Sequence, residues 1–356
     1  MNKAFGIFIF VAFYAGYCPS AWAQWPQAPV SALFIGNSYT FYNDLPGMVR
    51  QMAAAAGQDL YVESYTPGGY TFQQHSTDAT ALSKIRSRAW DVVVLQEQSQ
   101  RPSFPPSQVQ NEVFPFARIL ADSIRSNHPC TRTVFYMTWG RENGDQQNCQ
   151  FYPPLCTYAG MQERLRSSYI EMAEQNAAWT APVGAAWRAV RAQNPEIMLY
   201  AGDQSHPSLA GSYLAACVIY STIFGSPEYL YAPNLGEETY LPLQNAARNT
   251  VFDSLNVWKI GAFDPRAFAE YTVFGDSVVF QNLSAYAQQF SWDFGDGNTS
   301  FAPLPSHVYA LPGDFTVTLT AQNACLTDVY TFTVTVDTIP NDTIPNDTIP
   351  NDTIPN

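Results

Sequence analysis

The feature that most constrains this chain is a stretch near its start, where an apolar segment runs into a glycine-bearing turn and a serine. Residues 30–35 are mostly apolar, Gly36-Asn37-Ser38 follows, and residues 45–56 carry a helix-like pattern. Strand, tight turn and helix in this order are typical of an open α/β sheet, which binds ligands at the C-terminal edge of its strands. Backbone N–H groups at the start of a helix can stabilise an anion there. Ser38 is therefore a candidate nucleophile, although serine is also a common helix N-cap.

Strand-like and helix-like segments continue to alternate up to about residue 260. Apolar runs at residues 60–65, 91–95 and 133–137 are separated by segments with helical periodicity. The continuous apolar run at 91–95 is typical of a strand buried on both faces. The alternation predicts a parallel sheet with helices on both faces, a three-layer α/β/α sandwich, for residues 24–260.

The pattern changes at about Gly261. Residues 261–336 alternate at period two between turn clusters, which predicts a small all-β sandwich. The last segment, residues 337–356, repeats Asp-Thr-Ile-Pro-Asn, and its regular prolines predict an extended or disordered tail. Each repeat resembles an O-glycosylation motif of Bacteroidota, and a plain spacer is the alternative interpretation.

The first 23 residues have the features of a signal peptide. Lys3 supplies a positive charge, residues 5–17 are apolar but too short to span a bilayer, and Ala21-Trp22-Ala23 fits a cleavage site. The sequence therefore predicts a protein that is secreted, periplasmic or on the cell surface. No other stretch predicts a membrane span.

The composition argues against nucleic acid as a partner. The chain has 356 residues and a net charge of −13, and only 13% of its residues are charged, whereas phosphate binding needs clustered Lys and Arg. Aromatic residues make up 15% of the chain, which suits neutral polar ligands such as sugars.

Six cysteines are present, and Cys18 lies in the predicted signal peptide. The other five are Cys130, Cys149, Cys156, Cys217 and Cys325. Export permits disulfides; Cys149 and Cys156 share one loop and are the preferred pair, although Cys130 could compete for either. Cys217 lies in an apolar helical segment and is predicted to be a buried thiol. An odd number leaves at least one free thiol in a monomer.

A second polar motif, Asp203-Gln204-Ser205-His206, precedes a late apolar helix. An aspartate three residues before a histidine can hold the imidazole by Nδ1 while Nε2 faces a nucleophile. Ser38, Asp203 and His206 together supply the parts of a nucleophilic triad.

These two motifs resemble the N-terminal Gly-x-Ser block and the C-terminal Asp-x-x-His block of the SGNH (GDSL-like) hydrolase superfamily. The resemblance covers about residues 28–225 and implies an α/β/α fold and serine esterase chemistry. It implies an oxyanion hole formed by the N–H groups of Ser38 and Gly69. The family's Gly-x-Asn-Asp block is replaced here by Leu95-Gln96-Glu97-Gln98. Counting from Trp90 favours Gln98 as the third donor, and Gln96 is the alternative.

Three further side chains near these blocks are candidates for other roles. His75 is expected to line the pocket or bind substrate, or else to be a structural histidine. Trp139 could stack on a sugar, or belong to the core. Glu97 near the mouth could cap or orient a neighbour. The sequence contains no Cys/His cluster with metal-ligand spacing and no phosphate-binding glycine loop, so we expect no metal and no cofactor.

The C-terminal segment resembles a polycystic-kidney-disease-type (PKD) domain. The resemblance rests on the run 292–297, Trp-Asp-Phe-Gly-Asp-Gly, followed by His307-Val308-Tyr309 and Pro312-Gly313-Asp314. Asp293 and Asp296 could bind calcium, but side-chain hydrogen bonds that hold the turn are the favoured interpretation.

Taken together, the sequence predicts an exported serine esterase that removes acetyl or another small acyl group from a glycan. The PKD-type domain could contact a cell-surface polysaccharide. Two alternatives stay open. One is a non-catalytic surface or glycan-binding protein that retains the hydrolase fold, and the other is an O-acyltransferase that uses the same triad.

Overall fold

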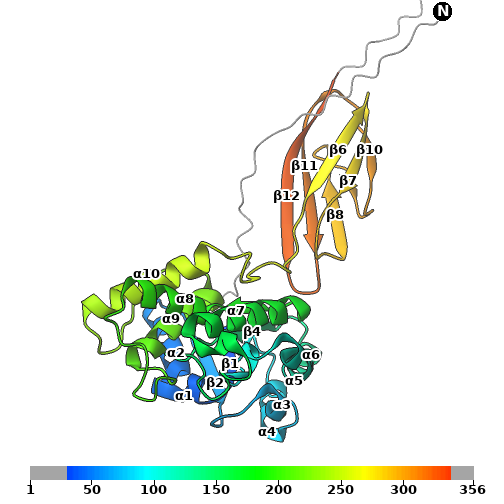
Figure 1. Cartoon of the computed structure of the whole chain (residues 1–356). Coiled ribbons are helices and arrows are strands. Elements are labelled where there is room, and N and C mark those ends of the chain that lie inside the picture. The colour runs from blue at the N-terminus through cyan, green and yellow to red at the C-terminus, as the bar shows by residue number, and fades with distance from the viewer. Residues whose placement is uncertain (1–29, 338–356) are drawn as a thin grey trace, which may run out of the picture.

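The computed structural model describes residues 30–337. The predicted signal peptide lies outside this range, as does the repeat tail beyond Asp337. An α/β domain comes first along the chain and a β-sandwich follows it (Figure 1).

The α/β domain is built on a five-stranded parallel sheet with the order β2-β1-β3-β4-β5. Its strands are β1 (Val30–Ile35), β2 (Leu60–Tyr65), β3 (Val92–Leu95), β4 (Arg132–Tyr136) and β5 (Trp179–Ala181). Every residue of β1 and β3 is buried, which explains their apolar sequences. β1 pairs with β2 on one side and β3 on the other. The chain therefore leaves β1 where the strand order reverses, the usual ligand site of such sheets.

Helices flank this sheet (Figure 1). They are α1 (Ser38–Phe41), α2 (Leu45–Ala55), α3 (Phe72–His75), α4 (Ala79–Arg86), α5 (Pro106–Glu112), α6 (Phe114–Asn127), α7 (Tyr158–Gln175), α8 (Val183–Gln193), α9 (Leu209–Phe224) and α10 (Glu237–Phe252). Short 3₁₀ helices are η1 (Tyr42–Asp44), η2 (Arg101–Ser103) and η3 (Pro153–Cys156). α9 is buried almost all round because it lies between other helices of the domain. Ser208 caps its N-terminus, with the hydroxyl accepting the Gly211 N–H at 3.1 Å.

The β-sandwich consists of a sheet with the order β10-β7-β6 and a sheet with the order β12-β11-β8-β9. Its strands are β6 (Ala269–Phe274), β7 (Ser277–Asn282), β8 (Gln289–Asp293), β9 (Thr299–Ser300), β10 (Ser306–Val308), β11 (Gly313–Gln322) and β12 (Thr327–Val336). Phe280, Trp292 and Leu319 are buried in its core. The expected architecture, an α/β sandwich with a parallel sheet followed by an all-β sandwich, is confirmed.

The turn after β8 is held by its own aspartates. Asp293 Oδ1 accepts the Gly295 N–H at 2.9 Å, and Asp296 Oδ1 accepts the Asn298 N–H at 3.0 Å. These bonds agree with the turn interpretation rather than with the calcium alternative.

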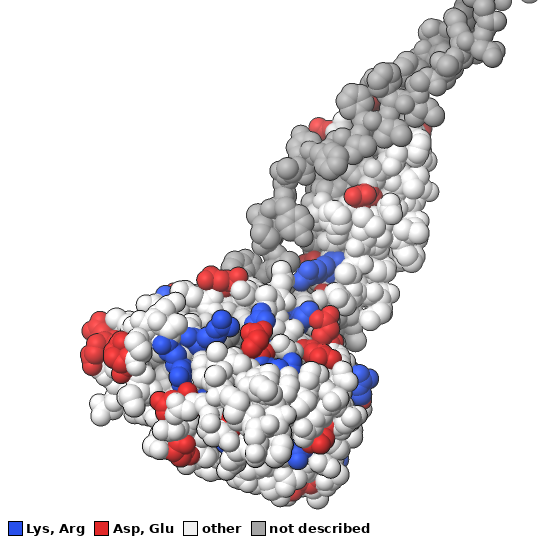
Figure 2. All heavy atoms as spheres, in the orientation of Figure 1, with Lys and Arg blue, Asp and Glu red and all other residues white. Residues whose placement is uncertain are grey.

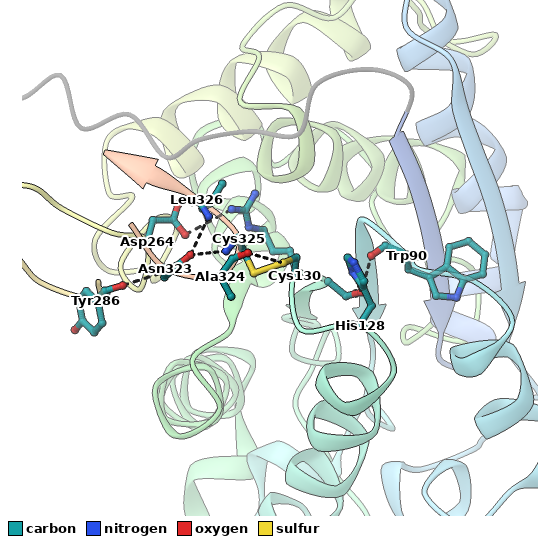
Figure 3. Close-up of a disulfide and its surroundings, with 11 residues drawn as sticks. Trp90, His128, Cys130, Asp264, Tyr286, Asn323, Ala324, Cys325 and Leu326 are labelled. Carbon is teal, nitrogen blue, oxygen red and sulfur yellow. Dashed lines mark hydrogen bonds and ion pairs between the residues drawn. A yellow bond between two sulfur atoms is a disulfide. The ribbon is translucent and has the colours of Figure 1, made fainter. Parts of the chain in front are cut away.

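Two disulfides are present among the described residues, and the sequence predicted one of them. Cys149 pairs with Cys156, as expected, and Cys217 is a buried free thiol in α9. The other disulfide joins Cys130 to Cys325, which lie 195 positions apart in the chain (Figure 3). The interpretation of Cys130 as a competitor in the 149–156 loop was therefore wrong.

The Cys130–Cys325 disulfide links the two domains. Cys130 comes just before β4, at the N-terminal edge of the parallel sheet, and Cys325 lies in the turn between β11 and β12. Asn323 Oδ1 holds this turn by accepting the N–H groups of Cys325 and Leu326, both at 2.8 Å (Figure 3). Because Ser38 follows the C-terminal end of β1, the link is at the opposite edge from the candidate nucleophile. In Figure 1, α1 and the sandwich lie at opposite ends of the α/β domain.

Charged side chains are unevenly spread over the face seen in Figure 2. Lys and Arg lie mainly on the α/β domain, close to Asp and Glu, and the sandwich is mostly uncharged. On this face the two domains therefore differ in surface chemistry as well as in fold.

Candidate active site

The turn after β1 places Ser38 at the first position of α1. Asn37 is the N-cap, and its Oδ1 accepts the Tyr39 N–H at 3.2 Å. Gly36 is required by packing, because a Cβ there would lie 2.5 Å from Thr40 Oγ1 and 2.7 Å from Gln96 Oε1. The first N–H groups of a helix have no partner within the helix, so this turn presents donors beside the Ser38 hydroxyl.

The loop before α9 brings His206 to Ser38. His206 Nε2 lies 2.8 Å from Ser38 Oγ, and His206 Nδ1 contacts Asp203 Oδ2. Asp203 Oδ1 accepts the N–H groups of Ser205 and His206 at 3.1 and 2.9 Å. The three residues that the sequence analysis selected thus lie in hydrogen-bonding contact, in the order that a serine nucleophile needs.

Asp203 is held in its charged form. Burial opposes ionisation, but the hydrogen bonds from His206 and Ser205 outweigh it, and the pKa of Asp203 lies below its ordinary value. An ionised carboxylate at Nδ1 fixes the imidazole so that Nε2 can accept a proton from Ser38.

The loop between Asp203 and His206 is held by hydrogen bonds from another loop of the domain. Gln204 has a left-handed backbone with φ of 61°, an unfavourable conformation for a residue with a side chain. Its carbonyl accepts the Glu142 N–H at 3.0 Å, and its Oε1 accepts Asn143 Nδ2 at 3.0 Å. Glu142 and Asn143 begin the loop that the Cys149–Cys156 disulfide closes, so this loop helps to place Asp203 and His206.

Gly69 lies on an exposed turn with φ of 73°, and no other group would lie within 4 Å of a Cβ at this position. The turn is tied to the segment just before Ser38, because Asn37 Nδ2 donates to the Tyr70 carbonyl at 2.8 Å. The side of the turn at Gly69 is therefore open to solvent.

The two glutamines hold loops, and the expectation that one of them is the third oxyanion donor requires correction. The fully buried Gln96 Oε1 accepts the Asn37 N–H at 2.9 Å and the Thr40 hydroxyl at 2.8 Å, while its Nε2 donates to the Glu97 carbonyl. Gln98 Nε2 donates to Gln100 Oε1 at 3.1 Å, and its Oε1 accepts the Gln100 N–H at 2.8 Å. Gln96 therefore supports the nucleophile turn, and Gln98 braces the segment that leads into η2.

His75 and Trp139, expected as substrate-binding residues, are both fully buried, so the structural alternatives apply instead. His75 Nε2 donates to the Gly36 carbonyl at 2.8 Å, and burial lowers the pKa of the ring. Trp139 stacks on Tyr39 at 4.7 Å and on Trp187 at 3.9 Å between ring centroids. Neither side chain can reach substrate from these positions.

Glu97 caps a helix, as one interpretation of the sequence suggested. Both carboxylate oxygens accept the Phe72 N–H at the start of α3, at 3.1 and 3.0 Å. Because Glu97 is fully buried, desolvation raises its pKa to about 7 despite these bonds. Its charge therefore depends on pH near neutrality.

Tyr42 and Asn43 are site residues that the sequence analysis missed. The Tyr42 ring stacks on the His206 imidazole at 4.4 Å with an interplanar angle of 14°. Asn43 Nδ2 donates to Ser212 Oγ at 2.9 Å and to the Ser208 carbonyl at 3.1 Å. The sequence marks these two residues only by their position, five residues or fewer after Ser38. They belong to no motif with a characteristic spacing.

Two kinds of feature are absent from residues 30–337. No group of three or more His, Cys, Asp or Glu there could hold a metal ion. Within the same range, no helix is long and apolar enough to cross a membrane.

Comparison with known proteins agrees with this organisation. Residues 262–338 match the family model of the PKD domain. A PKD1 domain from a Vibrio cholerae metalloprotease, PrtV, is 37% identical; the match covers 21% of this chain and 98% of that one, with a TM-score of 0.20. No curated protein matches the sequence.

For the α/β domain, a DUF4886 family protein from Bacteroides uniformis is 17% identical, with 62% of this chain and 94% of that chain covered and a TM-score of 0.54. This likeness shows the fold. A candidate SGNH hydrolase from Slackia heliotrinireducens is 27% identical, with 54% and 97% of the two chains covered and a TM-score of 0.44. The expected order, an α/β domain with a parallel sheet followed by a segment that matches the PKD domain model, is confirmed.

Proposed function

We propose that this chain is an exported serine esterase that hydrolyses an O-acetyl or other small acyl ester on a carbohydrate. The contact of 2.8 Å between Ser38 Oγ and His206 Nε2, with Asp203 at Nδ1, is the observation that carries the proposal. It meets the geometric requirement for a nucleophile and its general base.

In the first half of the proposed reaction, Ser38 Oγ attacks the ester carbonyl while His206 Nε2 takes the hydroxyl proton. Asp203 stabilises the imidazolium that forms. The N–H groups of Ser38 and Gly69 stabilise the oxyanion, and each such donor is typically worth roughly 3–4 kcal/mol of barrier. The intermediate then collapses: the C–O bond to the alcohol breaks, and His206 gives its proton to the leaving oxygen.

In the second half, water attacks the acyl group on Ser38. His206 takes a proton from this water and returns it to Ser38 Oγ, which releases the carboxylic acid and restores the enzyme. An O-acyltransferase would differ only in that a second alcohol replaces water.

Export and carbohydrate as the substrate are part of the proposal. Disulfides and a PKD domain are compatible with an extracellular protein, and the predicted signal peptide would supply the route. The sandwich, whose face in Figure 2 carries few charged side chains, could contact a polysaccharide at the cell surface.

Acetate release from p-nitrophenyl acetate by the purified protein, compared with Ser38→Ala, tests the chemistry. We expect turnover that Ser38→Ala abolishes while the circular dichroism spectrum is kept. Equal turnover by both proteins, or none by the intact chain on any acyl ester tried, would reject the esterase and favour the non-catalytic alternative.

A further inference from the structure

Two aromatic rings continue outward from the face of His206. Tyr42 stacks on the imidazole, and Phe41 lies against Tyr42 with ring centroids 5.5 Å apart and an angle of 28°. Phe41 is 46% exposed, at the C-terminal end of α1. We call Phe41 and Tyr42 the aromatic rim.

Hydrogen bonds hold the backbone that follows the aromatic rim, although the rim is partly exposed. Asn43, directly after it, has a left-handed backbone with φ of 54°, and so does Asp44, with φ of 52°. Asn43 Nδ2 donates to the Pro207 carbonyl at 3.3 Å as well as to the carbonyl and hydroxyl described above. Ser212 Oγ donates in turn to the Tyr42 carbonyl at 3.3 Å. A single exposed phenylalanine needs no explanation, but one fixed by strained backbone beside a catalytic histidine does.

The proposed chemistry determines which part of a substrate lies near this rim. His206 Nε2 gives its proton to the oxygen of the leaving alcohol, so this oxygen must lie within hydrogen-bond reach of Nε2. Tyr42 covers one face of the same imidazole and Tyr39 meets it edge-on at 5.3 Å. An alcohol group at Nε2 that extends on the side of Tyr42 would therefore meet the aromatic rim.

We infer that the aromatic rim binds the alcohol part of the ester, and that this alcohol is a neutral pyranose ring. A pyranose has a flat, largely apolar face that can lie on aromatic rings, and its hydroxyl groups stay in water. Neither rim side chain is charged, so the rim offers nothing to pair with an ionised alcohol. This inference rests on the proposed esterase function and identifies Phe41 as a specificity-determining residue.

The test compares two esters with the same acyl group. Methyl glucopyranoside monoacetates have an alcohol large enough to reach Phe41, and ethyl acetate does not. We expect Phe41→Ala to lower kcat/KM for the best sugar acetate by roughly 10-fold, mainly through KM, and to change kcat/KM for ethyl acetate much less. Phe41→Trp should retain the preference for the sugar ester, and Phe301→Ala, on the sandwich, should alter neither substrate.

The outcomes separate this inference from the proposed function. If Ser38→Ala abolishes acetate release but Phe41→Ala leaves the ratio of the two substrates unchanged, the rim does not bind the alcohol and the esterase stands. An intact enzyme that prefers ethyl acetate to every sugar acetate also overturns the inference. If Ser38→Ala keeps full activity, the proposed function itself fails. Phe41→Leu, which keeps an apolar side chain without a ring face, repeats the test should Phe41→Ala fail to fold.

Discussion

Each domain contains an Asp–His pair, and the two pairs are used differently. In the α/β domain, His206 contacts Asp203 through Nδ1 and leaves Nε2 for Ser38. In the sandwich, His307 turns Nε2 to Asp296 at 2.7 Å, and its ring stacks on Phe294 at 4.3 Å with an angle of 5°. The second histidine is thus a brace between a turn and a core ring.

Electrostatics alone does not distinguish the pairs. In both, burial opposes ionisation of the aspartate, and the hydrogen bond from histidine contributes to a net lowering of its pKa. The difference is the nitrogen that remains available and what faces it. His206 directs its second nitrogen at the Ser38 hydroxyl and can take its proton, whereas His307 uses Nε2 to hold the Asp296 turn.

The largest expected effect on turnover comes from replacing one histidine at a time with glutamine. His206→Gln should lower kcat by roughly 10⁵–10⁶-fold, because it removes the base of a triad that acts as a unit. His307→Gln should leave ester turnover unchanged and lower only the melting temperature. Comparable loss of turnover in both variants would show that the sandwich takes part in catalysis.

The aspartates should show the same contrast with a smaller amplitude. Asp203→Asn leaves the shape intact but favours the wrong tautomer of His206, so we expect kcat to fall roughly 10³–10⁴-fold. Asp296→Asn should act on thermal unfolding alone. Steady-state rates measured beside melting curves will separate the two, and normal kcat in Asp203→Asn would refute its assigned role.

The two glutamines after β3 test how the site is supported. Gln96→Ala removes a buried acceptor of two hydrogen bonds at the nucleophile turn, which should lower kcat about 10–100-fold and cost about 2–3 kcal/mol of unfolding free energy. Gln98→Ala should cost much less in both measurements. If Gln98→Ala instead lowered kcat more than Gln96→Ala, Gln98 would again be the candidate for the third oxyanion donor.

Glu97 should make stability, rather than turnover, depend on pH. Its pKa is raised from an ordinary value of 4.5 to about 7 in the folded protein. The folded state therefore binds the proton more tightly than the unfolded chain, and the free energy of unfolding falls as pH rises from about 4.5 to 7. Denaturant titrations should show a loss of up to about 3 kcal/mol across this window, and Glu97→Gln should remove that part of the slope.

Separating the domains should have the smallest effect. A chain ending at Gly261, with Cys130→Ser to avoid an unpaired thiol, should turn over p-nitrophenyl acetate at the normal rate, because the interdomain disulfide lies at the far edge of the sheet. The full-length Cys130→Ser/Cys325→Ser protein is the control. Loss of activity in a folded truncated chain would show that the sandwich completes the site.

Local patterns in the sequence were enough to predict the first four strands of the parallel sheet, the turn at Ser38 and the loop at His206. Their apolar runs and short spacings depend on neighbouring residues alone. The role of the glutamines was not predictable, because the path of the chain after β3 depends on a buried contact between Glu97 and the distant Phe72. Burial of His75 and Trp139 likewise depends on how separate elements pack.

The Cys130–Cys325 disulfide was not predicted for the same reason. Its cysteines lie 195 positions apart and in different domains, so no local pattern connects them. Cys149 and Cys156, only seven positions apart, could be paired from the sequence because they share one loop.

The Cys130–Cys325 disulfide also determines how the molecule would bear a pulling force. Suppose that the α/β domain is held at its N-terminus or by a bound ligand, and that tension is applied at Asp337. The force would enter β12, cross the disulfide and pass directly to Cys130, just before β4. Everything between the two cysteines would be bypassed, including the linker and all other strands of the sandwich. Within the sandwich only β12 could be peeled away, so the sandwich would lengthen little before the load reached the sheet that carries Ser38.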